Sequence, residues 1–222
     1  MGVEMDLGLL DWIAPLGCMA CDLPLTGDGR TAAAPFPGGE RFCAACRVLI
    51  EPSAEPWGPY AFGGPLAHAI HRLKYQNRTD IADALGQLWV GSCRDLGGKV
   101  DVIVPMPLHR LRLFRRGYNQ VTLLARPVSR DLGVPIVGSR LVRTRATAPQ
   151  VSLAPEARRE NVRGAFRARR VEGLRVLLLD DVRTTGATLE AAEGALWEGG
   201  AKAVWSRCLA VAAGRGAASR AA

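Results

Sequence analysis

The stretch that most constrains the fold is residues 176–189, in which an apolar run, two acids, a small-residue turn and a helix start follow one another. The four apolar residues 176–179 predict a strand buried on both faces, as in a parallel sheet. Asp180 and Asp181 come where this strand is expected to end, and residues 189–197 have helical composition. Because parallel strands need crossover connections that are usually helices, the stretch predicts an α/β protein with a doubly wound, mostly parallel sheet.

The residues after the two acids have the chemistry of an anion site. The turn consists of Thr184, Thr185, Gly186, Ala187 and Thr188. Backbone N–H groups in such a turn and at a helix N-terminus attract phosphate, and threonine hydroxyls add donors. Carboxylates repel phosphate, so we expect the two acids to bind sugar hydroxyls or a divalent cation beside it. The stretch predicts a sugar-phosphate site, although an ordinary strand–loop–helix junction with threonine caps would have the same composition.

Several classes of protein are excluded or disfavoured. No lysine follows Gly186, so the spacing of a P-loop is absent. No apolar run approaches the roughly 18 residues that a membrane span needs. Residues 1–14 contain three acids and no basic residue, unlike a signal peptide, so we expect a cytoplasmic protein. The 222 residues allow one ordinary domain and a small module. The expected division is a cysteine-containing module at 1–55, a main domain at 56–213 and a disordered tail at 214–222.

Positive charge gathers in the middle of the chain. The formal net charge is +8, and residues 110–183 contain 17 arginines against six acids. A GC-rich genome would explain the preference for arginine over lysine, but it would not explain this segregation. A positive segment directly before a phosphate-type motif favours phosphate-rich substrates or nucleic acid as partners.

Two Cys-x-x-Cys pairs near the start of the chain predict a metal site. Cys18 and Cys21 form the first pair, Cys43 and Cys46 form the second, and 21 residues lie between the pairs. Each pair makes a tight turn that aims two thiolates at one tetrahedral ion. Structural zinc is the expected metal, because no histidine or further ligand stands nearby. The alternatives are disulfides, which a cytoplasmic protein disfavours, and an iron–sulfur cluster.

Other histidines and cysteines have less specific chemistry. His68 and His71 lie three apart on a predicted helix at 65–75, and without a matching ligand they are more often a solvated pair than a metal site. Cys93 and Cys208 are isolated, so we expect small buried apolar residues rather than nucleophiles. The remaining pattern predicts helices at 6–13, 79–90 and 121–132 and strands at 57–62, 135–142 and 203–211.

A second loop is expected beside the acid pair. The apolar strand at 101–105 leads into Met106 and Pro107, and loops at the carboxyl ends of strands form the ligand-binding edge of a doubly wound sheet. Residues 110–118 then interleave arginines with aromatic residues. This composition suits either a mobile lid over pyrophosphate or a stacking platform for bases, and a solvated arginine-rich helix start would also have it.

Residues 143–170 have few apolar residues and no clear period. Such a long segment without regular structure is abnormal inside a compact domain unless it is functional. We interpret the segment, with Gln150, Arg159 and Asn161, as a hood over the site.

These motifs occur in one order that resembles a known family. The order is four cysteines, then 73–75 (Leu-Lys-Tyr), 104–108 (Val-Pro-Met-Pro-Leu), 116–120 (Arg-Gly-Tyr-Asn-Gln), Gln150, 159–162 (Arg-Glu-Asn-Val) and 180–189. In this order the chain resembles the ComF (competence protein F) family of phosphoribosyltransferase-like proteins, over nearly all of residues 18–211. The resemblance implies a type I phosphoribosyltransferase fold with an N-terminal zinc module and a pocket for 5-phosphoribosyl-1-pyrophosphate (PRPP). The family is linked to competence, the uptake of transforming DNA.

The resemblance also implies roles for individual residues. Asp180 and Asp181 would hold the ribose hydroxyls, directly or through Mg²⁺, and Lys74 would neutralise the leaving group. The turn at 184–188 would hold the 5′-phosphate. The remaining implied contacts come from a pyrophosphate loop (Met106 and Pro107), an arginine lid (Arg112, Arg115 and Arg116) and the hood that would read the acceptor (Gln150, Arg159 and Asn161).

Two functions agree with these features. In the first, the protein is a phosphoribosyltransferase, a glycosyltransferase that moves phosphoribosyl from PRPP to a nitrogen nucleophile with Mg²⁺. In the second, the protein keeps the phosphate pocket without catalysis and binds single-stranded DNA or a DNA-uptake helicase through residues 110–118 and the cysteine module.

Overall fold

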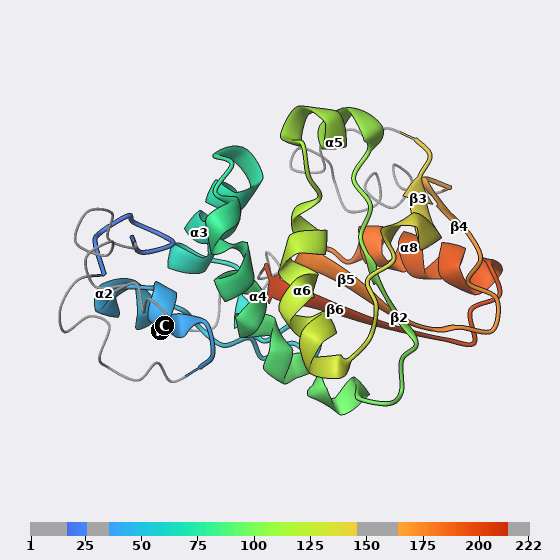
Figure 1. Cartoon of the computed structure of the whole chain (residues 1–222), viewed down its shortest axis with the longest axis horizontal. Helices are drawn as coiled ribbons and strands as arrows, with labels where there is room; N and C mark the ends of the chain where they lie inside the picture. The colour runs from blue at the N-terminus through green and yellow to red at the C-terminus, as the bar shows by residue number, and fades with distance from the viewer. Residues whose placement is uncertain (1–16, 26–35, 146–163, 213–222) are drawn as a thin grey trace, which may run out of the picture.

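The computed structural model describes residues 17–25, 36–145 and 164–212, and a four-stranded sheet forms its centre (Figure 1). All neighbouring strands of this sheet run parallel, as the sequence predicts. In spatial order the strands are β1 (Tyr60–Ala61), β6 (Ala203–Val211), β5 (Arg175–Arg183) and β2 (Val102–Pro105). The strand with the two acids, β5, is therefore an interior strand between β6 and β2.

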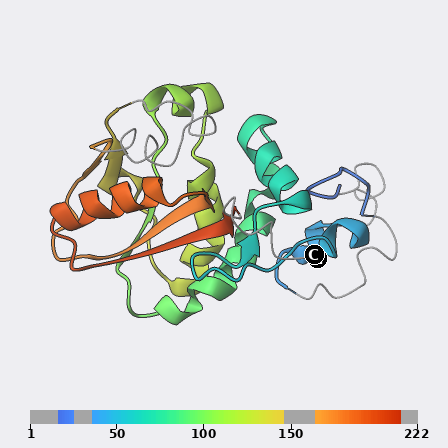
Figure 2. The same cartoon turned by 180° about the vertical axis from the view of Figure 1, so that it is seen from behind.

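Helices cover both faces of the sheet (Figures 1 and 2). Helix α8 (Ala187–Glu198) packs on one face, while α6 (Gln120–Leu132) and α4 (Ala82–Val90) pack against each other on the opposite face. Residues 176–179 are 0% exposed, because an interior strand of a sheet covered on both faces has no side that meets solvent. The predicted doubly wound α/β fold class is confirmed.

Strand β5 is longer than the sequence predicts. Its pairing with β6 continues past residue 179, since Asp180 pairs with Cys208 and Val182 with Ala210. The neighbouring strand β6 is equally long, so its backbone groups keep extending the ladder beyond the apolar run. The two acids are therefore part of the strand rather than of the loop after it.

The strand predicted at 135–142 is formed only in part. One parallel bridge joins Ile136 to Ile103, and a 3₁₀ turn, η5 (Gly138–Arg140), follows. The chain then enters β3 (Leu141–Arg143), which pairs antiparallel with β4 (Phe166–Ala168) in a separate two-stranded sheet. Both ends of the predicted irregular segment 143–170 are thus regular, because they pair with each other.

The cysteine-containing segment packs on one helix of the main body. Its described parts are residues 17–25, η2 (Gly39–Arg41) and α2 (Ala44–Arg47). Met19 and Phe42 are fully buried in the same apolar cluster as residues of α3 (Gly64–Tyr75). Figure 1 shows α2 beside α3, on the side of α3 that is away from the sheet. After α3 the chain forms η3 (Thr79–Ile81), α4 and η4 (Gly91–Leu96), and after β2 it forms α5 (Arg110–Arg116).

Some expectations fall outside the described residues. They are the helix at 6–13, the hood residues Gln150, Arg159 and Asn161, and the tail at 214–222. Within the described ranges, no helix is both long and apolar enough to cross a membrane.

Candidate functional site

The carboxyl end of β5 brings the acid pair together with a lysine from α3 and a glutamine from α6. Asp181 is 4% exposed, and its Oδ1 accepts a hydrogen bond from Lys74 Nζ at 2.8 Å. Its Oδ2 accepts from Gln120 Nε2 at 2.7 Å. Both carboxylate oxygens are thus satisfied in a buried position, where an unpaired charge would be costly. The structure places the predicted residues Lys74 and Asp181 in direct contact.

The neighbouring acid, Asp180, has a different environment. Successive residues of a strand point to opposite faces, so the two carboxylates make different hydrogen bonds. Burial and then the charge of Asp181 raise the pKa of Asp180 to about 7, although Lys74 opposes this shift. Asp180 Oδ1 accepts one hydrogen bond, from the backbone N–H of Asp181 at 2.9 Å. A carboxylate that is costly to ionise is a ready ligand for a cation or a hydroxyl donor.

The turn after β5 has the form of an anion site. Gly186 has φ +86° and is the N-cap of α8, so the chain turns in the left-handed region that favours glycine. The hydroxyl oxygen of Thr185 is buried and makes no hydrogen bond in the structure. A buried hydroxyl without a partner costs about 1–3 kcal/mol, which a ligand that accepts its hydrogen bond would recover. Thr184 is exposed beside it.

Arg183 and Trp57 support this turn, and the sequence did not single them out. The Arg183 guanidinium lies 4.4 Å from the centroid of the Trp57 ring and 3.8 Å from Glu190 Oε1. A Cβ built on Gly186 would lie 2.3 Å from Arg183 Nη2. The absence of a side chain at Gly186 therefore lets the stacked guanidinium lie against the turn.

The second strand-end loop adjoins β5 but lacks free amide donors at its start. The N–H of Met106 donates to the carbonyl of Leu179 at 2.7 Å, and Pro107 has no N–H. The Met106 carbonyl accepts from Asn119 Nδ2 at 3.0 Å. Positive charge for a pyrophosphate group at this loop would have to come from side chains.

The three arginines predicted to form a lid lie in different environments. Arg116 donates to the side-chain oxygen of Gln120 and lies 5.4 Å from the centroid of the Tyr75 ring. Gln120 thereby joins Arg116 to Asp181. Arg112 and Arg115 are exposed on α5, which has no buried residue. Of the predicted lid, only Arg116 is joined to the acid pair.

Two residues that the sequence did not assign belong to this region. Gln120 is the first residue of α6, and Asn119 caps that helix by accepting from the N–H of Val121. Arg143, at the end of β3, lies 5.3 Å from the centroid of the Phe166 ring. Burial and then the nearby charge of Arg112 lower the pKa of Arg143, and the charge of Asp180 opposes this shift. Gln120 and Arg143 reach the site through contacts between distant parts of the chain. No local sequence pattern predicts such contacts.

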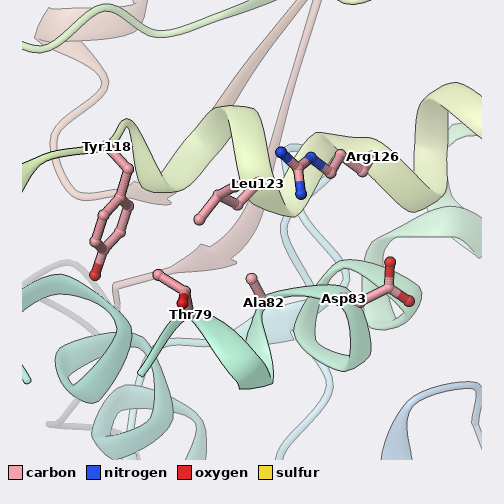
Figure 3. Close-up of a pocket in the computed structure, with 6 residues that line it drawn as sticks. All are labelled: Thr79, Ala82, Asp83, Tyr118, Leu123 and Arg126. Carbon is pink, nitrogen blue, oxygen red and sulfur yellow. The ribbon is translucent and has the colours of Figure 1, made fainter. Parts of the chain in front are cut away.

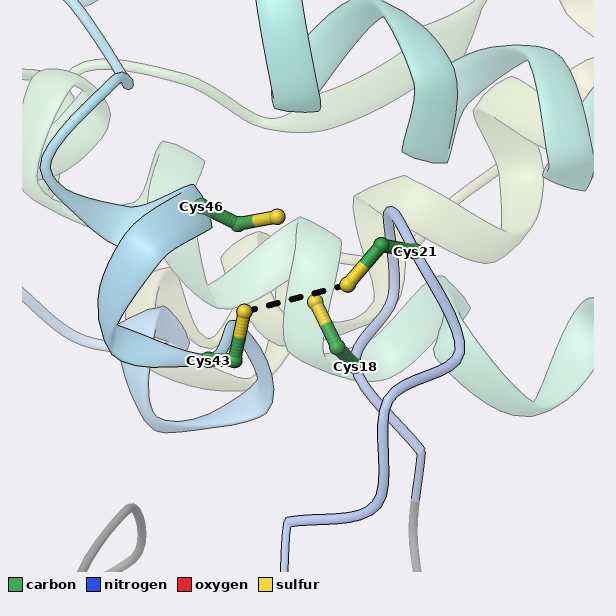
Figure 4. A group of neighbouring side chains, drawn as sticks. All are labelled: Cys18, Cys21, Cys43 and Cys46. Atoms are coloured by element: carbon green, nitrogen blue, oxygen red, sulfur yellow. Dashed lines mark hydrogen bonds between the residues drawn. The ribbon is translucent and has the colours of Figure 1, made fainter.

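The four cysteines form a cluster that fits one tetrahedral ion (Figure 4). Their sulfur atoms all lie within 4.8 Å of one another, and Cys21 Sγ and Cys43 Sγ are 3.8 Å apart. A zinc ion with Zn–S bonds of about 2.3 Å places its sulfurs roughly 3.8 Å apart. Burial opposes ionisation of Cys18, but the backbone N–H groups of Cys43, Cys21 and Ala20 lower the pKa of its thiol to about 7. The predicted clustering of these cysteines is confirmed, and none of the six cysteines, all of which are described, forms a disulfide.

The two histidines on α3 and the two isolated cysteines lie where the sequence predicts. His68 and His71 are exposed, and the rings of His71 and Tyr75 lie 4.6 Å apart. Cys93 and Cys208 are 0% exposed, as predicted.

A separate cavity of about 300 Å³ lies between η3, α4 and α6 (Figure 3). The Tyr118 hydroxyl donates to the Leu73 carbonyl of α3, which fixes the ring as one wall. The lining residues are Thr79, Ala82, Asp83, Tyr118, Leu123 and Arg126. None of the predicted site residues lines this cavity, so it is distinct from the acid pair.

The comparisons with known proteins give related sequences and a solved structure that overlaps part of the chain. No protein-family model matches the chain. It is 39% identical over 154 residues to DNA utilization protein YhgH of Escherichia coli K12, covering 67% of this chain and 68% of the relative. It is 37% identical over 134 residues to competence protein F of Haemophilus influenzae, covering 56% and 58%. A solved glutamine PRPP amidotransferase from Bacillus subtilis has a TM-score of 0.40 and 20% identity, covering 62% of this chain and 30% of that one.

Proposed function

The chain belongs to the competence protein F (ComF) family, and we propose that it binds a phosphorylated ribose, PRPP or a close relative, at the carboxyl end of β5. The observation that carries the proposal is the convergence of Lys74 and Gln120 on Asp181, beside a turn in which the Thr185 hydroxyl lacks a partner. Ribose hydroxyls would donate to the carboxylates, and the turn would donate to the 5′-phosphate.

The acid pair also suits Mg²⁺. Carboxylate oxygens are the ligands that Mg²⁺ takes in phosphate sites. A divalent cation would offset the repulsion by Asp181 that contributes to the raised pKa of Asp180. When bound, Mg²⁺ would supply positive charge that stabilises a departing pyrophosphate.

The proposed reaction is transfer of phosphoribosyl to a nitrogen nucleophile. The bond between ribose C1 and the pyrophosphate oxygen breaks, both electrons leave with pyrophosphate, a C1–N bond forms, and the nitrogen releases its proton to the departing pyrophosphate. The protein contributes positioning and charge rather than a covalent nucleophile. Lys74 and Arg116 would face the pyrophosphate, and Arg112 and Arg115 would approach from α5. Gln150, Arg159 and Asn161 stay predictions for the acceptor side.

Ligand-dependent stability tests the pocket directly. PRPP with Mg²⁺ should raise the melting temperature of the wild-type protein, because a ligand that binds only the folded state stabilises it. Asp180→Asn and Asp181→Asn should abolish this shift. Arg130→Ala is a matched control, since its side chain pairs with Asp83 on exposed surface away from β5. A wild-type protein that shows no shift at saturating PRPP would refute the pocket. A screen of nucleobases and amines for pyrophosphate release would then test transfer.

A second candidate function is binding of single-stranded DNA or of a DNA-uptake helicase, and α5 favours it. Phe114 is 88% exposed on a helix that contains four arginines and no acid. Exposed aromatic rings stack on bases while arginines follow the phosphates. The names of the relatives, which refer to DNA utilization and competence, agree with this function.

Salt dependence tests this second function. Affinity for an oligonucleotide should fall steeply with salt, and Phe114→Ala with Arg115→Ala should weaken it. Arg130→Ala should leave it unchanged. Absence of binding at low salt would exclude the function.

We also propose that the four cysteines hold structural zinc, that the module at 1–55 and the domain at 56–213 are the units of the chain, and that the protein acts in the cytoplasm. The cluster fits zinc, because four thiolates around one ion form a closed site without an open position for catalysis.

A further inference from the structure

Helix α3 contacts both the cysteine cluster and the acid pair. On one side, Arg72 is only 8% exposed, and its Nη1 lies 3.5 Å from the Cys18 carbonyl and 3.3 Å from the Met19 carbonyl. Its Nη2 donates to the carboxylate of Asp22. Arg72 therefore binds the turn that contains the first two cysteines.

On its other side, the same helix presents Lys74 to Asp181 at 2.8 Å. Residues two apart on an α-helix point about 200° away from each other, so these side chains leave on opposite sides. The distance between the two contacts is spanned by one short piece of rigid helix. A shift of the cysteine turn that moved Arg72 would move Lys74 as well.

Further contacts fix the cysteine turn to the end of α3. Arg78 Nη1 lies 2.7 Å from Asp22 Oδ1, and Arg78 also pairs with Asp80 at 2.8 Å. The Arg72 side chain also donates from Nε to Gln76 at 3.2 Å, which orients the guanidinium. Asp22 thus joins two arginines, one in α3 and one just after it. Among the described residues, Asp22 is the carboxylate that forms an ion pair with Arg72.

We infer that Arg72 is a positioning residue that couples the four-cysteine cluster to the phosphate site by holding α3, and with it Lys74, in place. An ion bound by the cysteines would fix the turn whose carbonyls accept hydrogen bonds from Arg72. Metal binding therefore favours the Lys74–Asp181 contact. The consequence for ligand affinity rests on the proposed PRPP pocket, but the coupling itself does not.

Lysine footprinting tests the coupling without any ligand. The chain has three lysines, and Lys99 and Lys202 are exposed internal controls. Lys74 must leave Asp181 before its amine can be acetylated, so loss of Arg72 should speed its modification roughly threefold or more. The variants are Arg72→Met and the milder Asp22→Asn, which removes an exposed partner and spares the core. Chelation of the metal should have the same effect, and Arg130→Ala should have none. An unchanged Lys74 rate in folded Asp22→Asn and in chelated protein would overturn the inference.

A mutant cycle then tests whether Arg72 acts through Lys74. Arg72→Met should weaken PRPP binding roughly fivefold to tenfold in the wild-type background and have almost no effect in a Lys74→Met background. Arg72→Lys keeps the positive charge but loses the planar guanidinium that donates several hydrogen bonds. This variant should weaken PRPP binding by an intermediate factor. Equal losses in both backgrounds would show that Arg72 acts independently of Lys74 and refute the inference. If wild-type protein does not bind PRPP, the proposed function fails, while the footprinting result still decides the coupling.

Discussion

Asp181 shows how a buried carboxylate at a strand end is stabilised by donors that lie far from it in the chain. Lys74 is 107 residues away and Gln120 is 61 residues away, yet each satisfies one of its oxygens. Gln120 also accepts from Arg116, so one amide side chain joins the acid pair to α5. Gln120 and Lys74 together hold the Asp181 carboxylate in place.

Replacement of Gln120 by methionine should destabilise the protein. The substitution preserves the approximate volume but leaves Asp181 Oδ2 buried without a donor, which costs about 1–3 kcal/mol. Urea unfolding should show a lower midpoint with an unchanged slope. Gln87→Met, on α4, is the matched control and should have little effect. Equal stability of the Gln120 and Gln87 variants would contradict the role of the amide.

The pair of Asp101 and Arg175 predicts a pH dependence away from the site. Hydrogen bonds from the Arg175 side chain and backbone hold the pKa of Asp101 at about 2, below its ordinary value of 3.8. Because the folded-state pKa is depressed, the contribution to stability is complete above about pH 4 and is lost as the pH falls through about 2. Asp101→Asn should therefore lower the melting temperature at pH 7, and the difference from wild type should shrink below pH 4. A difference that stays constant down to pH 3 would contradict this explanation.

At the level of elements, the close crossing of α4 and α6 depends on a glycine. Gly86 is buried in α4, and a Cβ there would lie 2.4 Å from the Leu124 carbonyl and 2.8 Å from the ring of Pro127. The two helices approach this closely because no side chain separates them. Their packing holds the N-terminus of α6, and therefore Gln120, at the end of the sheet.

Gly86→Ala should force α4 and α6 apart. Overpacking of this kind costs about 1–3 kcal/mol, although alanine favours helix intrinsically. The control is Gly194→Ala in α8, where a Cβ would meet nothing within 4 Å and helix propensity should make the change neutral or stabilising. Calorimetric melting of both variants would separate the effects. A Gly86 variant that melts no lower than the Gly194 variant would show that the crossing can relax.

At the level of the whole molecule, the cysteine-containing segment shares its interior with the main body. Met19 and Phe42 belong to the same apolar cluster as Leu66 and Leu73 of α3. The sequence between Cys21 and Phe42 contains few large apolar residues, so a bound metal ion would have to supply much of the energy that holds the two cysteine pairs together. Loss of the metal ion should therefore destabilise α3 before the rest of the main body, and it should affect the sheet least.

Metal analysis tests this arrangement. Purified protein should contain one zinc ion per chain, and Cys21→Ser should lose it, whereas Cys93→Ala should keep it. Chelation should increase hydrogen exchange in residues 17–25 and 36–50 much more than in β5 and β6, because local opening follows the loss of local contacts. A metal-free protein with wild-type stability would refute the zinc assignment.

Local sequence alone was enough to predict the elements that carry the site. The apolar run before Asp180, the small-residue turn with Gly186 and the two cysteine pairs are short-range patterns, and backbone hydrogen bonding and ligand spacing depend on such patterns directly. The strand, the turn, helix α8 and the cysteine cluster were predicted correctly for this reason. The extension of β5 to Arg183 was not, because the length of the ladder depends on the neighbouring strand β6.

Only the tertiary structure decided which side chains surround residues 176–189. The contacts of Asp181 with Lys74 and Gln120, the stacking of Arg183 on Trp57 and the grip of Arg72 on the cysteine turn all join distant parts of the chain. Each depends on how helices pack on the sheet, which is a property of the whole core rather than of any window of sequence. The sequence by itself determined that an acid pair and a Thr-Thr-Gly turn lie at the carboxyl end of one parallel strand. The packing of α3, α6 and Trp57, which precedes β1, around that strand end determined the partners of the acid pair and of the turn.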